Sequence, residues 1–84
     1  MVWMMLADAH DGLAVRITAI ELEGEAAAWV EAVGLHAGEE LVVLRRAVLG
    51  GPLHVRTGGG GEFAVAREVA GRIAVVKLDG SDAP

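Results

Sequence analysis

Apolar residues come in short runs along this chain, and clusters of glycine separate the runs. Residues 13–22, 39–49, 53–57, 62–65 and 72–78 are rich in valine, isoleucine and leucine. β-Branched residues favour extended backbone, and short apolar runs between turn signals are typical of a small barrel or sandwich. We therefore predict about five strands at these positions.

The first predicted strand, residues 13–22, has two faces. Val15, Ile17 and Ala19 point to one side if the strand is regular. Residues 2–6, which precede it, are apolar without alternation. They fit either a further strand or an irregular lead-in.

One segment, residues 25–33, predicts a helix. Its sequence, EAAAWVEAV, contains three consecutive alanines and begins with an acidic residue near the positive end of the helix dipole. Gly34 follows at the position where a left-handed residue ends a helix. The apolar stripe of the helix consists of Ala26, Trp29, Val30 and Val33. We expect this stripe, with Trp29, to pack inward.

Turn signals connect the remaining elements. Gly50, Gly51 and Pro52 join two apolar runs and predict a hairpin, and the four glycines at 58–61 predict a second hairpin loop. Residues 67–70 fit a single helical turn. The predicted fold is mainly β: a small, strongly bent β-barrel of about five strands with one short inserted α-helix.

Length and charge limit what the chain can do. Its 84 residues predict one domain, with a core at about 6–78 and a flexible tail at 79–84. Seven basic and twelve acidic residues give a net charge of −5, which argues against nucleic-acid binding. The chain has no run of about 20 apolar residues and no secretory signal. We expect a cytoplasmic protein without direct membrane insertion.

The residues for catalysis are missing. There is no cysteine, the single serine, Ser81, lies in the predicted tail, and the carboxylates are scattered along solvated faces. Acid–base catalysis needs two groups that converge in a pocket. The glycines at 58–61 lack the lysine and helix of a phosphate-binding loop. We therefore predict no catalytic residues, no cofactor and no enzymatic activity.

Three histidines are candidate ligands for a metal ion. His10, His36 and His54 lie in different segments, and none pairs with another at helical spacing. Ligands from distant segments can still meet in a folded protein. His36 and His54 are the candidate ligands, and exposed turn histidines are the alternative.

Two kinds of residue are candidates for contact with a partner. Arg45, Arg46 and Arg56 form a basic spot if they face one another across the predicted hairpin, or they pair with carboxylates across strands. Trp3 and Trp29 are large enough to anchor a partner, or they fill the core.

The order of the segments resembles the FeoA family, ferrous iron transport protein A. Residues 33–38, VGLHAG, resemble the family's LGL-x-x-G signature, which closes a short helix and opens a long strand. Residues 44–55 resemble its hairpin with G-x-P-L, and residues 62–75 its final segment. Within these segments the motif positions are Gly34, Gly38, Gly51 and Pro52. The resemblance covers roughly residues 6–76.

The resemblance implies an SH3-like β-barrel with an inserted helix. It also implies a cytosolic accessory of the FeoB ferrous iron transporter, a membrane GTPase-permease. We place the contact on the bulky and charged residues around the signature: Trp29, Val33, Leu35, Arg45, Arg46 and Arg56. The alternative is a freestanding relative of the C-terminal domain of DtxR-type metal-dependent repressors, with a metal-sensing or regulatory role. Exposed edge strands would also allow a homodimer.

Overall fold

A computed structural model, which describes residues 3–78, contains six strands and three short helices. The strands are β1 (Trp3–Met5), β2 (Ala14–Ile20), β3 (Glu40–Arg46), β4 (Leu53–Thr57), β5 (Glu62–Val65) and β6 (Ile73–Lys77). The helices are the 3₁₀ turn η1 (Leu6–Asp8), α1 (Gly24–Ala32) and α2 (Arg67–Ala70). The predicted mainly β fold with one short inserted helix is confirmed.

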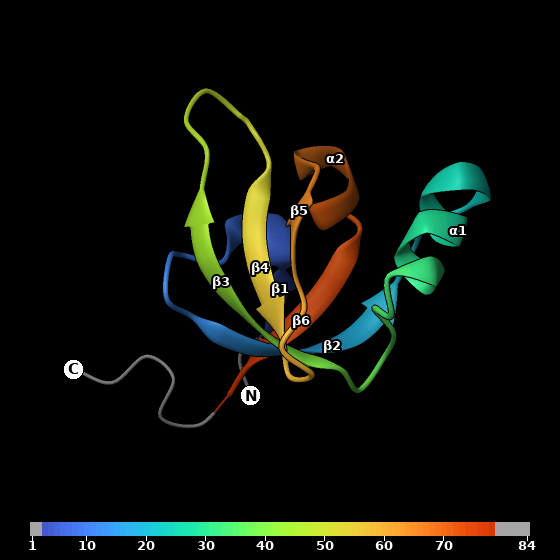
Figure 1. The fold of residues 1–84 in the computed structure, drawn as a ribbon, viewed down its shortest axis with the longest axis horizontal. Coiled ribbons are helices and arrows are strands. Elements are labelled where there is room, and N and C mark those ends of the chain that lie inside the picture. Colours follow the sequence, from blue (N-terminus) through green and yellow to red (C-terminus); the bar gives the residue numbers. More distant parts are fainter. Residues whose placement is uncertain (1–2, 79–84) are drawn as a thin grey trace.

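All six strands belong to one antiparallel sheet, in the order β1-β6-β2-β3-β4-β5. The sheet curls strongly, and α1 lies to one side of it (Figure 1). Within residues 3–78, no pairing joins β1 to β5, so the barrel is not closed by hydrogen bonds. The sixth strand is β1, which pairs with β6 from Trp3 opposite Val76 to Met5 opposite Ala74. Of the two interpretations of the apolar lead-in, the strand is correct.

The core lies inside the curled sheet and follows a period of two along the strands. Each of the five longer strands contributes alternate side chains that are almost completely buried: Val15, Ile17, Leu41, Val43, Leu53, Val55, Val65, Ile73 and Val75. Leu6, Leu13, Val30 and Leu35 complete the core from the connections and from α1. None of the buried residues is polar or charged within the part of the chain that the structure describes. Apolar burial is therefore the main stabilising term.

The first predicted strand ends earlier than expected and is irregular. The pairing of β2 with β6 shifts between Ile17 and Ala19. Such a bulge inserts one extra residue and moves the following side chain to the other face. Ala19 is therefore exposed, and the prediction that it shares a face with Val15 and Ile17 is wrong.

The long strand predicted at residues 39–49 is also too long. β3 ends at Arg46, because the amide of Ala47 bonds to the carbonyl of Pro52 and closes a turn. Leu49 then adopts a left-handed backbone with φ of 60°. The hairpin itself, the strands at 53–57 and 62–65 and the helical turn at 67–70 are confirmed. The predicted tail at 79–84 lies outside the described residues.

Gly34 fixes the C-terminal end of α1. Gly34 has φ of 91°, and its amide donates to the carbonyl of Glu31, while the amide of Leu35 donates to the carbonyl of Val30. A left-handed glycine at this position ends a helix and turns the chain back. Of the helix's own residues, only Val30 is buried. The helix is therefore held to the barrel by one edge and leaves most of its surface open.

Candidate functional site

A groove lies between α1 and the segment formed by β5 and α2. Ala26 and Trp29 line it from the helix, and Ala64, Ala66 and Val69 line it from the other side. Its volume is about 260 Å³. None of the described residues that line it is charged, and three of them are alanines. An apolar groove of this kind suits an apolar side chain of a partner rather than a polar substrate.

Trp29 borders this groove. Its ring meets the ring of Phe63 edge to face, with centroids 5.9 Å apart and an angle of 89° between the planes. This geometry is favourable for aromatic pairs. The residue is still 37% exposed, so the expectation that Trp29 packs inward holds for one edge of the ring only. The exposed part is free to contact a partner.

The other two predicted contact residues near the helix differ in solvent exposure. Val33 is half-buried beside the core, and Leu35 is only 2% exposed. The turn at Gly34 directs Leu35 into the barrel, where it packs with Val30. Leu35 is thus a core residue in this structure, and we leave it out of the contact surface.

The α1 side of the groove is acidic. Residues 21–44 contain six of the twelve acidic residues of the chain and no lysine or arginine. Four of these glutamates, at 21, 23, 25 and 31, are exposed on α1 or just before it. Like charges so close together attract a partner of opposite sign.

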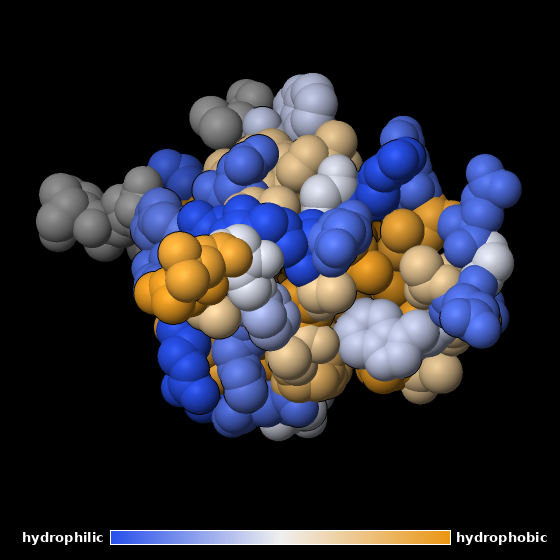
Figure 2. Space-filling model, turned by 90° about the horizontal axis from the view of Figure 1, so that it is seen from above, coloured by the Kyte–Doolittle hydropathy of each residue, from blue (hydrophilic) through white to orange (hydrophobic). Residues whose placement is uncertain are grey.

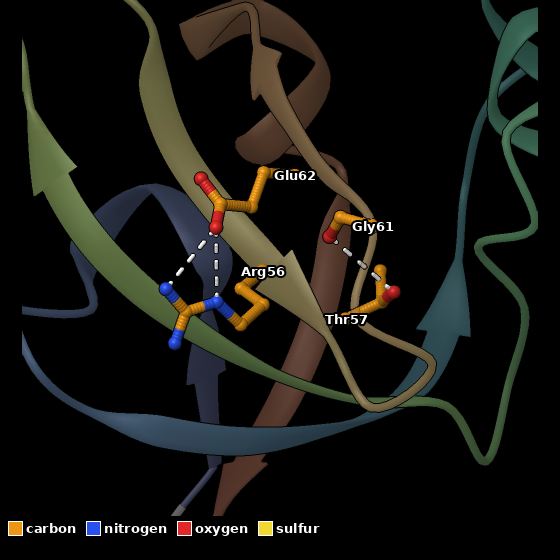
Figure 3. Close-up of polar contacts among 4 residues, drawn as sticks. All are labelled: Arg56, Thr57, Gly61 and Glu62. Carbon is orange, nitrogen blue, oxygen red and sulfur yellow. Dashed lines mark hydrogen bonds and ion pairs between the residues drawn. The ribbon is translucent and has the colours of Figure 1, made fainter.

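The predicted basic spot does not form. Arg56 lies opposite Glu62 on β5, and its Nε and Nη2 atoms both donate to Glu62 Oε2 at 3.1 Å (Figure 3). Arg46 donates to the carbonyl of Ala7, and Arg45 is exposed. For Arg56 the predicted pairing with a carboxylate is correct. None of the three arginines lines the groove beside Trp29.

The candidate metal ligands lie apart. His36 follows α1, and its Nε2 atom lies 3.5 Å from Glu39 Oε1. His54 is half-buried on β4, opposite Arg45 on one side and Ala64 on the other. Within residues 3–78, no three histidine, aspartate or glutamate side chains are grouped as a metal site requires.

The glycines of the signature have backbone roles. Gly34 and Gly38 have φ of 91° and 96°, and the amide of Gly38 donates to the carbonyl of Ile17 at 2.8 Å. These two residues set the path from α1 into β3. In the hairpin, a Cβ atom on Gly51 would lie 2.6 Å from the Cβ of Ala47, which is too close. Pro52 accepts the bond that closes the same turn.

Half of the groove is absent from the sequence-based predictions. Ala64, Ala66 and Val69 lie about 35 residues or more from Trp29 in the sequence, and the antiparallel sheet brings them to α1. Their one local signal is the pair of alanines two residues apart, which puts two small side chains on one face of an extended segment.

Comparison with known proteins identifies the family. The FeoA domain family model matches residues 4–77. A crystal structure of an iron uptake regulatory protein, FeoA, is 27% identical with a TM-score of 0.81, and the match covers 93% of this chain and all of the other. The FeoA protein of Chlorobium tepidum is 30% identical with a TM-score of 0.81, over 95% of this chain and 75% of the other. Among curated proteins, no match was found.

The fold also occurs in repressors. A manganese-dependent transcriptional repressor matches with a TM-score of 0.84 and 22% identity, over 90% of this chain but 37% of the repressor. This likeness concerns the fold alone and confirms the SH3-like barrel. No helix within residues 3–78 is long and apolar enough to cross a bilayer. The match along nearly the whole described chain shows that this protein belongs to the FeoA family, whose SH3-like domains are associated with iron transport.

Proposed function

We propose that this protein is a non-enzymatic accessory of ferrous iron uptake, and that it docks on the cytosolic part of a FeoB-type transporter through the groove beside Trp29. The observation that carries the proposal is the groove itself: an uncharged apolar opening bordered by a partly exposed tryptophan. Partly exposed aromatic residues next to apolar pockets are typical binding hot spots. FeoA domains are small accessory domains and are not a known class of enzyme.

The groove and its border define the chemistry of the partner segment. The lining of alanines and one valine leaves room for a medium-sized apolar side chain. The glutamates at 21, 23, 25 and 31 favour lysine or arginine close to that apolar residue. We expect the partner to present a short basic segment with an apolar residue at its centre.

A pull-down with matched variants tests this proposal. Transporter from detergent-solubilised membranes is captured on the immobilised domain, and wild type is compared with Ala64→Glu and Ala19→Glu. Both alanines are exposed on strands, but only Ala64 lines the groove. Wild type and Ala19→Glu should retain the transporter, and Ala64→Glu should lose it.

Trp29→Ala provides a second variant. It should weaken capture at least tenfold, because removal of an aromatic hot spot costs about 2 kcal/mol or more. Circular dichroism spectra confirm that each variant is folded. Equal capture by Ala64→Glu and Ala19→Glu, or no capture by wild type, would contradict docking at this groove.

The alternative is a metal-sensing domain related to the repressor barrels. The likeness in fold supports a common architecture, but residues 3–78 offer no cluster of ligands for the metal. We therefore favour docking on the transporter over metal sensing as the proposed function. Titration of Fe²⁺ under anaerobic conditions, followed by the NMR signals of His36 and His54, separates the two functions. Stoichiometric binding at micromolar metal would favour the alternative.

A further inference from the structure

The loop between β3 and β4, residues 47–52, carries the most exposed apolar side chains of the described chain. Val48 is 82% exposed, and Leu49 is fully exposed at 101%. Figure 1 shows this loop projecting beyond the sheet, and Figure 2 looks down onto that end of the molecule. There the two residues form an apolar tip, visible as an orange patch next to deep blue, strongly hydrophilic residues.

The tip is held in a defined conformation. The amide of Ala47 donates to the carbonyl of Pro52 at 2.9 Å, and the amide of Gly51 donates to the carbonyl of Val48 at 3.2 Å. Leu49 has φ of 60°, a left-handed conformation that is costly for a side chain with a Cβ atom. A glycine would fit this position better and would expose no apolar surface. Leucine here is unfavourable for the isolated domain in two independent ways, which points to a role outside it.

Three arginines lie next to the tip. Arg45 and Arg46 immediately precede the loop, and the Nε atom of Arg67 lies 3.9 Å from the place where a Cβ atom on Gly50 would be. Within residues 3–78, no carboxylate forms an ion pair with any of the three, whereas the arginines of β2 and β4 are each paired with a glutamate. This end of an otherwise acidic protein therefore carries three arginines that form no ion pair within the described residues, although Arg46 donates to the carbonyl of Ala7.

We propose that the tip inserts shallowly into an anionic lipid surface. Two apolar side chains enter the boundary between headgroups and acyl chains, and the exposed Arg45 contacts the lipid phosphates, while the half-buried Arg46 and Arg67 add positive charge nearby. The charge of the arginines is complementary to anionic headgroups. α1 lies on the opposite side of the molecule from the loop (Figure 1) and carries exposed glutamates, so repulsion from the same surface would orient the domain with its groove free. The proposal revises the sequence-based expectation of no direct membrane insertion, and it is independent of the transporter.

Flotation with lipid vesicles tests the proposal without any transporter. Vesicles of phosphatidylcholine alone are compared with vesicles that contain one quarter phosphatidylglycerol. Wild type should float with the anionic vesicles only, and 0.5 M NaCl should reduce the bound fraction because salt screens the arginines. Leu49→Gly should weaken binding about tenfold, since it removes one of the two inserted side chains. The same substitution should leave the melting temperature equal or higher, because glycine accepts the left-handed backbone.

Two further variants sharpen the test. Trp3→Ser removes an apolar side chain that is 64% exposed on β1, away from the loop, and should leave flotation unchanged. Arg45→Gln should weaken binding about fivefold. The proposal is overturned if wild type does not float with anionic vesicles, or if Leu49→Gly floats as well as wild type. It is also overturned if Leu49→Gly still floats with anionic vesicles but no longer captures the transporter, which would make the tip a protein contact.

Discussion

Replacement of Gly51 by alanine should destabilise the domain, although the change adds one methyl group at a half-buried position. The new Cβ atom would lie 2.6 Å from the Cβ of Ala47 and 3.3 Å from the carbonyl oxygen of Val48. Both neighbours are fixed to the backbone, so the hairpin loop must shift by close to 1 Å. Overpacking of this kind costs about 1–3 kcal/mol. In a domain of this size, about 2 kcal/mol corresponds to a fall in melting temperature of roughly 8–16 °C.

Thermal unfolding followed by circular dichroism measures this fall, and two further variants identify its cause. Gly59→Ala is the matched control, because nothing lies within 4 Å of its new Cβ atom and its φ is not left-handed. It should unfold within a few degrees of wild type. Ala47→Gly removes the atom that clashes, so the double variant with Gly51→Ala should recover most of the lost stability. A Gly51→Ala protein as stable as the Gly59→Ala protein would refute the argument and show that the loop yields easily.

Three other substitutions probe the core, the signature and the surface. Leu35→Ala should lower the free energy of unfolding by about 2–5 kcal/mol, because the side chain is 2% exposed, and urea titration measures the loss. Gly34→Ala should cost about 1–2 kcal/mol by the same assay, since φ of 91° is unfavourable for alanine even though the space around it is open. Arg56→Gln should cost less than about 1 kcal/mol, because its ion pair with Glu62 is roughly half exposed; a larger loss would show that the pair is more than a surface contact.

Local patterns in the sequence were enough for most of the fold. Short apolar runs between turn signals predicted the strands at 53–57 and 62–65, and three alanines followed by glycine predicted α1, with both ends one residue later than in the structure. The bulge after Ile17 was not predictable, because it depends on pairing with β6 more than 50 residues away. The same holds for β1, whose apolar residues form a strand only because β6 offers a free edge.

The candidate site was less accessible to sequence reasoning. Trp29 was identified from its size and its place on the helix, but its groove requires Ala64 and Ala66, which carry no chemical signal of their own. Leu35 was assigned to a partner because it is apolar and next to the signature, whereas the turn at Gly34 directs it into the core. Whether an apolar residue in a loop faces inward or outward depends on the backbone path, which residue type does not specify.

The attachment of α1 has a consequence for the dynamics of the domain. Because Val30 is the one buried residue of the helix, α1 can detach while the strands of the barrel stay paired. Segments with little buried surface open at free energies well below that of global unfolding. The amide protons of α1 should therefore exchange with solvent sooner than those in the middle of β2, β3 and β6. A partner that occupies the groove would slow this exchange selectively, so hydrogen exchange on α1 would report docking without any substitution in the chain.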